Sequence, residues 1–180
     1  MTELEVINEK LTELNDELVN YAKSLKFNVV CEFNLENCEN IPWGEIHSKG
    51  IYFIEIKNKT NFDNFQSWIK IFREEWEDDK YKYRFVPNLK NKRISKHQEL
   101  KDWIPLYIGK SRKISARIHQ HIFKEIEKTT FALKLNAREH AKKETFRLSI
   151  IEIPTNNYDW IVPVLEKTLR DEINPIIGKQ

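Results

Sequence analysis

The sequence has little glycine, little cysteine and no long apolar run. Its four glycines among 180 residues and its 32% content of charged residues exclude collagen-like and low-complexity proteins. No apolar stretch approaches the ~20 residues that a membrane-spanning helix needs, so we expect a soluble protein without a membrane partner. Residues 1–10 also lack the basic and apolar regions of a secretion signal, and this favours the cytoplasm.

The cysteines and the apolar content limit the architecture further. Cys31 and Cys38 have no second cysteine pair to complete a zinc site, so we expect reduced, structural thiols. Hydrophobic residues make up 40% of the chain and include five tryptophans. This is enough to bury one core with a helical extension, so we predict one main domain.

Charge is distributed unevenly, although the net charge is only +2. Residues 1–48 hold ten acidic side chains against three lysines, whereas residues 80–124 hold thirteen Lys and Arg against two acids. A basic segment of this density attracts polyanions, although a solvated basic face would explain the charges alone. Interleaved aromatic residues favour nucleic acid as the partner. These residues are Tyr81, Tyr83, Phe85, Trp103 and Tyr107.

The first segment predicts a long amphipathic helix, because its apolar residues recur at spacings of three and four. They are Leu4, Ile7, Leu11, Leu14, Leu18, Tyr21 and Leu25. Such a stripe can form a coiled-coil homodimer or dock on its own domain, and we expect it to dock on its own domain. Residues 1–48 are therefore interpreted as an N-terminal helical extension.

The rest of the chain predicts an α+β fold, a small and mostly antiparallel β-sheet flanked by helices. This domain spans residues 49–180 and contains an insertion at residues 58–102. Apolar runs rich in β-branched and aromatic residues predict the strands, which lie at residues 49–57, 104–109, 129–135 and 146–153. The predicted helices lie around residues 61–79, after Gly109 and over residues 158–175.

Local signals refine these elements. Gly109 is expected to let the backbone turn at the end of its strand. The helix that follows has Ile114, Ile118, Ile122 and Ile126 on its apolar stripe. Asp159 is expected to cap the last helix, and residues 88–97 are expected to form a basic loop within the insertion.

Two tripeptides suggest a family. Gly50-Ile51-Tyr52 lies on the first predicted strand and Tyr107-Ile108-Gly109 on the second. Further residues follow in a fixed order, namely Lys110, Arg117, His121, Glu166 and Pro175. In these features the chain resembles the GIY-YIG nuclease family, over residues 50–57 and 103–178. Two departures are the long insertion and Gly178, which stands where the family usually has an asparagine that braces the active site.

The resemblance implies a metal-dependent endonuclease that hydrolyses DNA. The implied catalytic residues are Tyr52, Tyr107, Lys110, Arg117, His121 and Glu166. Glu166 would bind one Mg²⁺ or Mn²⁺, because carboxylate oxygens suit these ions, and Arg117 would grip a phosphate with its planar fork. The general base is left open among Tyr52, Lys110 and His121.

Each of these residues also has an ordinary structural interpretation. Glu166 would form a surface pair with Arg170, Arg117 would be a solvated helix arginine, and the tyrosines would be half-buried strand aromatics. Three further side chains have no motif position and are expected to have ordinary surface roles, namely His97, His119 and Gln120.

The implied partner is DNA, most simply double-stranded, and a homodimer is left open. The residues expected to contact DNA are Lys90, Lys92, Arg93, Lys96 and Lys113. A restriction or phage-defence enzyme is the favoured role. The alternatives are a low-specificity repair or mobile-element nuclease, and a nucleic-acid-binding module without catalysis.

Overall fold

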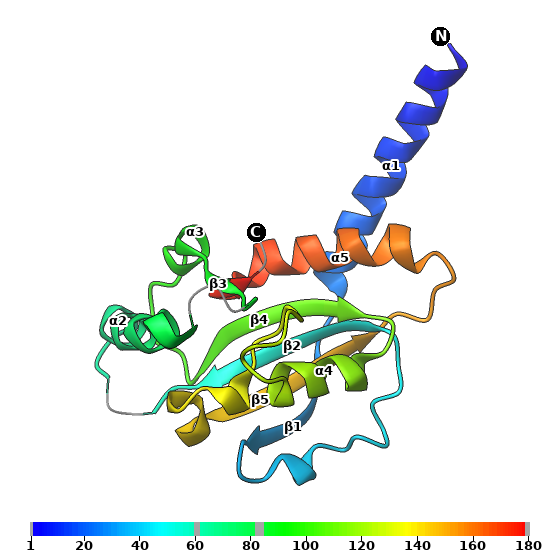
Figure 1. Ribbon diagram of the computed structural model, residues 1–180. Coiled ribbons are helices and arrows are strands. Elements are labelled where there is room, and N and C mark those ends of the chain that lie inside the picture. The colour runs from blue at the N-terminus through cyan, green and yellow to red at the C-terminus, as the bar shows by residue number, and fades with distance from the viewer. Residues whose placement is uncertain (1, 60–61, 82–84, 179–180) are drawn as a thin grey trace.

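The computed structural model describes residues 2–59, 62–81 and 85–178 (Figure 1). Its main sheet has four antiparallel strands in the order β1-β5-β2-β4. These strands are β1 (Asn28–Asn34), β2 (Gly50–Lys57), β4 (Trp103–Ser111) and β5 (Thr145–Glu152). A second, two-stranded sheet pairs β3 (Asn88–Leu89) with β6 (Ile177–Gly178). The predicted α+β class with a small antiparallel sheet flanked by helices is confirmed.

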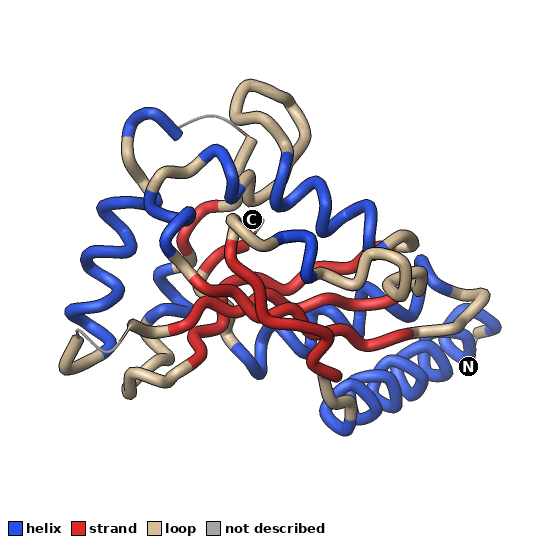
Figure 2. The backbone as a smooth tube through the Cα atoms, turned by 90° about the horizontal axis from the view of Figure 1, so that it is seen from below, coloured by secondary structure: helices blue, strands red, loops and turns tan. Residues whose placement is uncertain are grey.

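Helices cover both faces of the main sheet, and Figure 2 shows the strands in the middle of the molecule with helices around them. The helices are α1 (Glu3–Ser24), α2 (Phe65–Trp76), α3 (Asn91–Ile94), α4 (Ile114–Phe123) and α5 (Tyr158–Ile173). Residues of α5 and the end of α1 pack on one face with Ile51 and Ile108. Residues of α2 and α4 pack on the other face with Tyr52 and Leu106.

The N-terminal region contributes more than a helix. β1 lies within residues 1–48, and it pairs with β5 at one edge of the sheet. This strand is not among those predicted from the sequence, and it is short and only partly buried although four of its seven residues are apolar. The expected extension over residues 1–48 therefore includes part of the main sheet.

The prediction of a strand at residues 129–135 is wrong. The structure has irregular chain there, followed by a short 3-10 helix at Leu135–Ala137. Lys134 has a positive φ of 56°, and neighbouring backbone groups bond to side chains of α4. A backbone that bonds to side chains in this way cannot pair in a β-ladder.

Three local predictions also need correction. The predicted basic loop at 88–97 contains β3 and the short helix α3. Helix α4 ends at Phe123, so Ile126 lies outside its stripe. Asp159 lies in the first turn of α5 and not at its cap, which is Asn157.

Candidate active site

Tyr52 on β2 and Gly109 on β4 lie directly opposite one another in the antiparallel pair. A Cβ atom on residue 109 would lie 2.6 Å from Cζ of the Tyr52 ring. Glycine is needed at this position because the tyrosine ring covers it. The prediction of a turn at Gly109 is wrong, since β4 continues to Ser111. The two family tripeptides thus meet across one strand pair.

His121 on α4 is fully buried and fixes the hydroxyl of Tyr52. The backbone N–H of Leu133 donates to Nδ1 of His121 over 3.0 Å, so Nδ1 carries no proton. The neutral imidazole then carries its proton on Nε2, which lies 2.8 Å from the Tyr52 hydroxyl oxygen. Burial, followed by the charge of Arg117, holds the pKa of His121 well below its usual value and keeps the ring neutral.

This tautomer limits what His121 can do. Nε2 donates to Tyr52 and the lone pair of Nδ1 accepts from Leu133, so neither nitrogen is open to a substrate proton. In this arrangement His121 therefore orients the hydroxyl of Tyr52.

Tyr52 and Tyr107 form a buried pair of stacked rings with centroids 6.1 Å apart. Burial and then the neighbouring Tyr107 raise the pKa of Tyr52 well above its usual value, and burial also raises the pKa of Tyr107. The charge of Arg117 lowers the pKa of both hydroxyls but does not reverse the shift. Both phenols therefore stay protonated at neutral pH and act as hydrogen-bonding groups.

Arg117 on α4 lies beside the tyrosine hydroxyls and is partly exposed. Its Nη1 donates to Oε1 of Gln120 over 2.7 Å, and its Nη2 donates to the carbonyl of Phe131 over 2.6 Å. A guanidinium has five N–H donors, so these two bonds orient it and leave donors for an anion. Gln120 has a larger role than the surface role expected for it, because it positions Arg117.

Glu166 lies in the middle of α5 and is only 6% exposed. Nζ of Lys110 contacts its Oε2, and Nη1 of Arg170 lies 3.6 Å from its Oε1. The helical pair with Arg170 is therefore present, but its distance is too long for a hydrogen bond. The closer partner is Lys110, which follows the Tyr-Ile-Gly tripeptide on β4, so Glu166 belongs to the same site as that motif.

The two groups of side chains meet around β4, which is the last strand in the order of the main sheet. Successive residues of a strand point to opposite faces, so Tyr107 lies on the α4 side and Lys110 on the α5 side. Glu166 contributes, after burial, to the raised pKa of both Tyr52 and Tyr107. The six predicted catalytic residues thus form two groups around β4, one on each face of the sheet, and Glu166 lies within electrostatic range of both tyrosines.

A divalent metal would be held here by Glu166. Among the residues that the structure describes, there is no cluster of three or more His, Cys, Asp or Glu side chains that could hold a metal ion. Mg²⁺ nevertheless binds proteins through one or two carboxylates and completes its octahedron with water and phosphate oxygens. The donor set at Glu166 fits such an ion, provided that the ammonium group of Lys110 moves away from Oε2.

The basic residues expected to contact DNA differ in their surroundings. Lys92, Lys96 and Lys113 are exposed, and Lys90 is partly buried. Lys90, Lys92 and Lys96 lie on or next to α3, whereas Lys113 immediately precedes α4. Arg93 is the exception, as its side chain is only 18% exposed.

Arg93 lies against Gly178, the position where the family usually has asparagine. A Cβ atom on residue 178 would lie 3.0 Å from Nη1 of Arg93. Burial and then the charge of Arg170 lower the pKa of Arg93, whereas Asp171 and Glu166 raise it. Arg93 therefore fills the space beside Gly178 and lies within electrostatic range of Glu166.

Sequence reasoning misses the main-chain groups that hold the site. The carbonyl of Phe131 orients Arg117, and the N–H of Leu133 sets the tautomer of His121. No residue type encodes a main-chain contact, so the sequence offers no signal for either. The side chain of His97 contacts the carbonyl of Asn174, away from the predicted chemistry.

No protein-family model, curated protein or solved structure matches the chain. Among the helices of the described residues, none has the length and apolar character needed to cross a membrane. The geometry at β4 is therefore the basis for assigning a function.

Proposed function

We propose that the chain is a metal-dependent endonuclease of the GIY-YIG type that hydrolyses phosphodiester bonds in DNA. The observation that carries this proposal is the cluster at β4. Tyr52 is hydrogen-bonded to His121, and the ring of Tyr107 contacts both of their rings. Arg117 and the Lys110–Glu166 pair border this cluster. Five of these six side chains are buried or partly buried, which is costly for polar groups unless they are paired or serve a function.

Phosphodiester hydrolysis needs an oriented water and neutralisation of the charge that grows on the phosphate oxygens. The hydroxyl of Tyr52 accepts from His121 and keeps its own proton to donate, so it can orient a water or a phosphate oxygen. Arg117 has N–H groups left to bind two phosphate oxygens. A metal at Glu166 would add positive charge at the phosphate and leaving oxygen.

Lys110 and Glu166 form an ion pair, and this pair would have to separate before Glu166 could bind a metal. Glu166 would then be free to bind the metal, and the Lys110 side chain, which is 36% exposed, would be free to turn towards the reacting phosphate. The ammonium group of Lys110 has donors and no acceptor, so we assign it to the negative charge on the reacting phosphate, and we assign Tyr52 to orienting the attacking water.

DNA is the proposed substrate because residues 80–124 are strongly basic and Arg93 of this segment lies within electrostatic range of Glu166. We assign Arg93 to a substrate phosphate near Glu166, and we assign Lys90, Lys92, Lys96 and Lys113 to the flanking phosphates. A restriction or phage-defence role is the favoured setting, since this role needs only cleavage and a means of holding DNA.

The direct test is to incubate the full chain with supercoiled plasmid and Mg²⁺ or Mn²⁺ and to sequence the ends. We expect metal-dependent cleavage. Discrete ends would indicate a restriction-type enzyme, and scattered ends would indicate a nuclease of low specificity. DNA binding without cleavage in either metal would replace the proposal by a binding module that lacks catalysis.

A further inference from the structure

Most of α1 extends away from the rest of the molecule, as Figure 1 shows. The apolar stripe that was expected to dock on its own domain is exposed there, at 73% for Leu4, 60% for Leu11 and 55% for Leu14. Only the end of the helix docks, where Ala22 is buried and Leu18 is partly buried. The expectation that the whole stripe docks on its own domain is therefore wrong.

The projecting helix is nonetheless well formed at its start. The hydroxyl of Thr2 accepts from the backbone N–H of Glu5, and the Glu5 carboxylate accepts from the backbone N–H of Thr2. This capping box satisfies two backbone donors that would otherwise need water. The helix thus holds its apolar residues along a defined line, although its own domain does not cover them.

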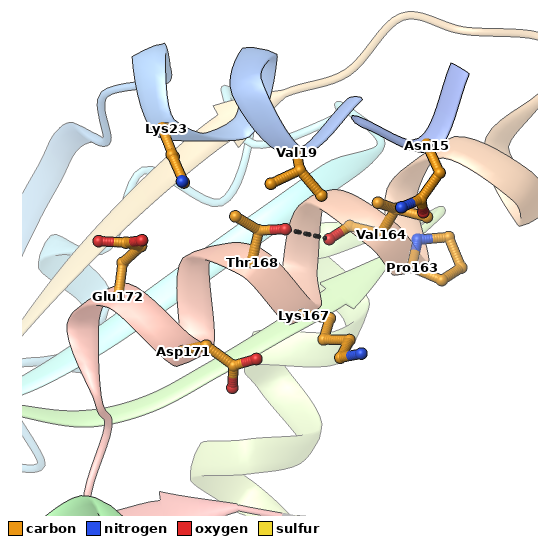
Figure 3. Close-up of a pocket in the computed structure, with 9 residues that line it drawn as sticks. All are labelled: Asn15, Val19, Lys23, Pro163, Val164, Lys167, Thr168, Asp171 and Glu172. Atoms are coloured by element: carbon orange, nitrogen blue, oxygen red, sulfur yellow. Dashed lines mark hydrogen bonds between the residues drawn. The ribbon is translucent and has the colours of Figure 1, made fainter. Parts of the chain in front are cut away.

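Helix α5 packs against the second half of α1. Figure 3 shows Asn15, Val19 and Lys23 of α1 facing α5. The apolar stripe instead borders a groove of ≈ 740 Å³ between the two helices, and Trp160, which is 82% exposed, stands at this groove. The groove is lined by Leu11, Leu14, Leu18, Tyr21, Ile161 and Val164, among others.

The spacing of the stripe is that of a coiled coil. Leu4, Leu11 and Leu18 occupy heptad position a, and Ile7, Leu14 and Tyr21 occupy position d. In this register Lys10 and Glu17 are both at position g. Both side chains are exposed, so both are available to a partner helix.

The charges distinguish the two ways in which two such helices can pair. In an antiparallel pair centred between Leu11 and Leu14, g positions face g positions, so Lys10 of each copy faces Glu17 of the other. In a parallel pair, Lys10 would face Asn15, and Glu17 would face the position of Ala22, which is already buried in its own domain. Only the antiparallel pair matches opposite charges.

We propose that α1 binds α1 of a second copy of this chain in an antiparallel coiled coil. The stripe at the start of each helix then lies over the groove beside Trp160 on the other copy, which covers the exposed leucines at both ends. The result is a homodimer joined through the projecting helices, with the catalytic edge β4 outside the contact. This inference does not depend on the nuclease proposal.

Sedimentation equilibrium of the full chain tests the proposal. We expect a dimer at micromolar concentration that Leu11→Glu converts to monomer, with an unchanged circular dichroism spectrum because Leu11 contributes nothing to its own domain core. A wild-type chain that stays monomeric would overturn the proposal, as would a dimer that survives Leu11→Glu.

Charge variants test the antiparallel arrangement. Lys10→Glu alone and Glu17→Lys alone each place like charges opposite one another, so each variant should dimerise more weakly than the wild type. A mixture of the two variants restores both opposite-charge pairs and should form a heterodimer as strong as the wild type. Glu9→Lys makes the same charge change on the outer side of the helix and should have no effect. Equal dimerisation of all variants would contradict the antiparallel pairing.

Discussion

Arg117 and Arg138 are two arginines with opposite surroundings. Arg117 is partly exposed beside the Tyr52 and Tyr107 hydroxyls, and it has N–H groups left for an anion. Arg138 is fully buried, and its guanidinium lies 3.7 Å from the centroid of the Trp76 ring and 4.6 Å from that of Tyr81. The difference separates a cation that has donors left for a ligand from a cation that is enclosed within the fold.

Arg138 joins the insertion to the rest of the domain. Its Nη1 donates to the carbonyl of Trp76, at the end of α2, and its Nε donates to the carbonyl of Leu133. Burial lowers the pKa of this arginine to about 10, so it remains charged at neutral pH. The cation is stabilised by carbonyl oxygens and aromatic faces.

The two arginines are linked through one short segment. Leu133 accepts from Arg138 with its carbonyl and donates to His121 with its N–H, and Phe131 accepts from Arg117. The insertion therefore helps to fix the residues that orient Tyr52. A change at Arg138 should reach the active site through the backbone of Leu133.

The largest expected effect is on folding and comes from Arg138→Ala. Removal of a large buried side chain together with its hydrogen bonds and ring contacts should lower the free energy of unfolding by about 3–5 kcal/mol. Denaturant titration measures this. Arg112 also lies over a tyrosine ring but is exposed, and Arg112→Ala should cost less than about 1 kcal/mol. If the two variants lost the same unfolding free energy, the enclosed position of Arg138 would not stabilise the fold more than the exposed position of Arg112.

Arg117→Ala should show the reverse pattern. Loss of a charged donor at the phosphate should lower the cleavage rate by about 10²–10³-fold. Its two hydrogen bonds are partly exposed, so the unfolding free energy should change by only about 1–2 kcal/mol. The rate is measured on plasmid under single-turnover conditions, with circular dichroism as the check on folding. An unfolded variant would place Arg117 with Arg138 as a structural residue.

Gly109→Ala should disturb the cluster without removing any of its functional groups. The added methyl group overlaps the ring of Tyr52, which must shift away from His121. We expect a loss of stability of about 1–3 kcal/mol and a lower cleavage rate. Gly44→Ala is the matched control, because a Cβ atom at residue 44 has nothing within 4 Å. Similar results for both variants would show that the Tyr52 contact is not important.

Acid should weaken the fold, because each arginine has a histidine beside it, of which His121 is buried and His140 is partly buried. Burial and then Arg138 lower the pKa of His140 to about 4, and burial and then Arg117 lower the pKa of His121. The unfolded chain takes up these protons near pH 6.5, whereas the folded chain does not. The stability is therefore complete above pH 6.5 and is lost as the pH falls from 6.5 towards 4.

The variant His140→Gln removes one of these two titrating groups and so tests its contribution to the pH dependence of stability. For a single proton the slope of the unfolding free energy is at most about 1.4 kcal/mol per pH unit. Denaturant titrations between pH 4 and 7 should show that the variant loses less stability on acidification than the wild type. Parallel curves for the two proteins would mean that His140 is protonated in the folded state over this range.

The sequence predicts the parts of the site that depend on side-chain type and spacing. The two tripeptides lie on the predicted strands, and the spacing of Arg117 and His121 on one helix is observed. The sequence does not predict the segment at residues 129–138. Its apolar residues favour a strand, and Arg138 stands in a polar stretch that resembles solvated loop. Its structure depends instead on contacts with α2 and α4, which are distant in the chain.

The measurement that tests the central claim most directly compares the wild type with Glu166→Gln on supercoiled plasmid over a Mg²⁺ titration. The substitution keeps the shape of the side chain and removes the charge that would hold the metal. We expect the wild type to cleave in proportion to bound Mg²⁺, and the variant to bind DNA with similar affinity but to leave the plasmid intact. Cleavage by the variant near the wild-type rate at saturating Mg²⁺ would contradict the assignment of Glu166 and, with it, the proposed active site.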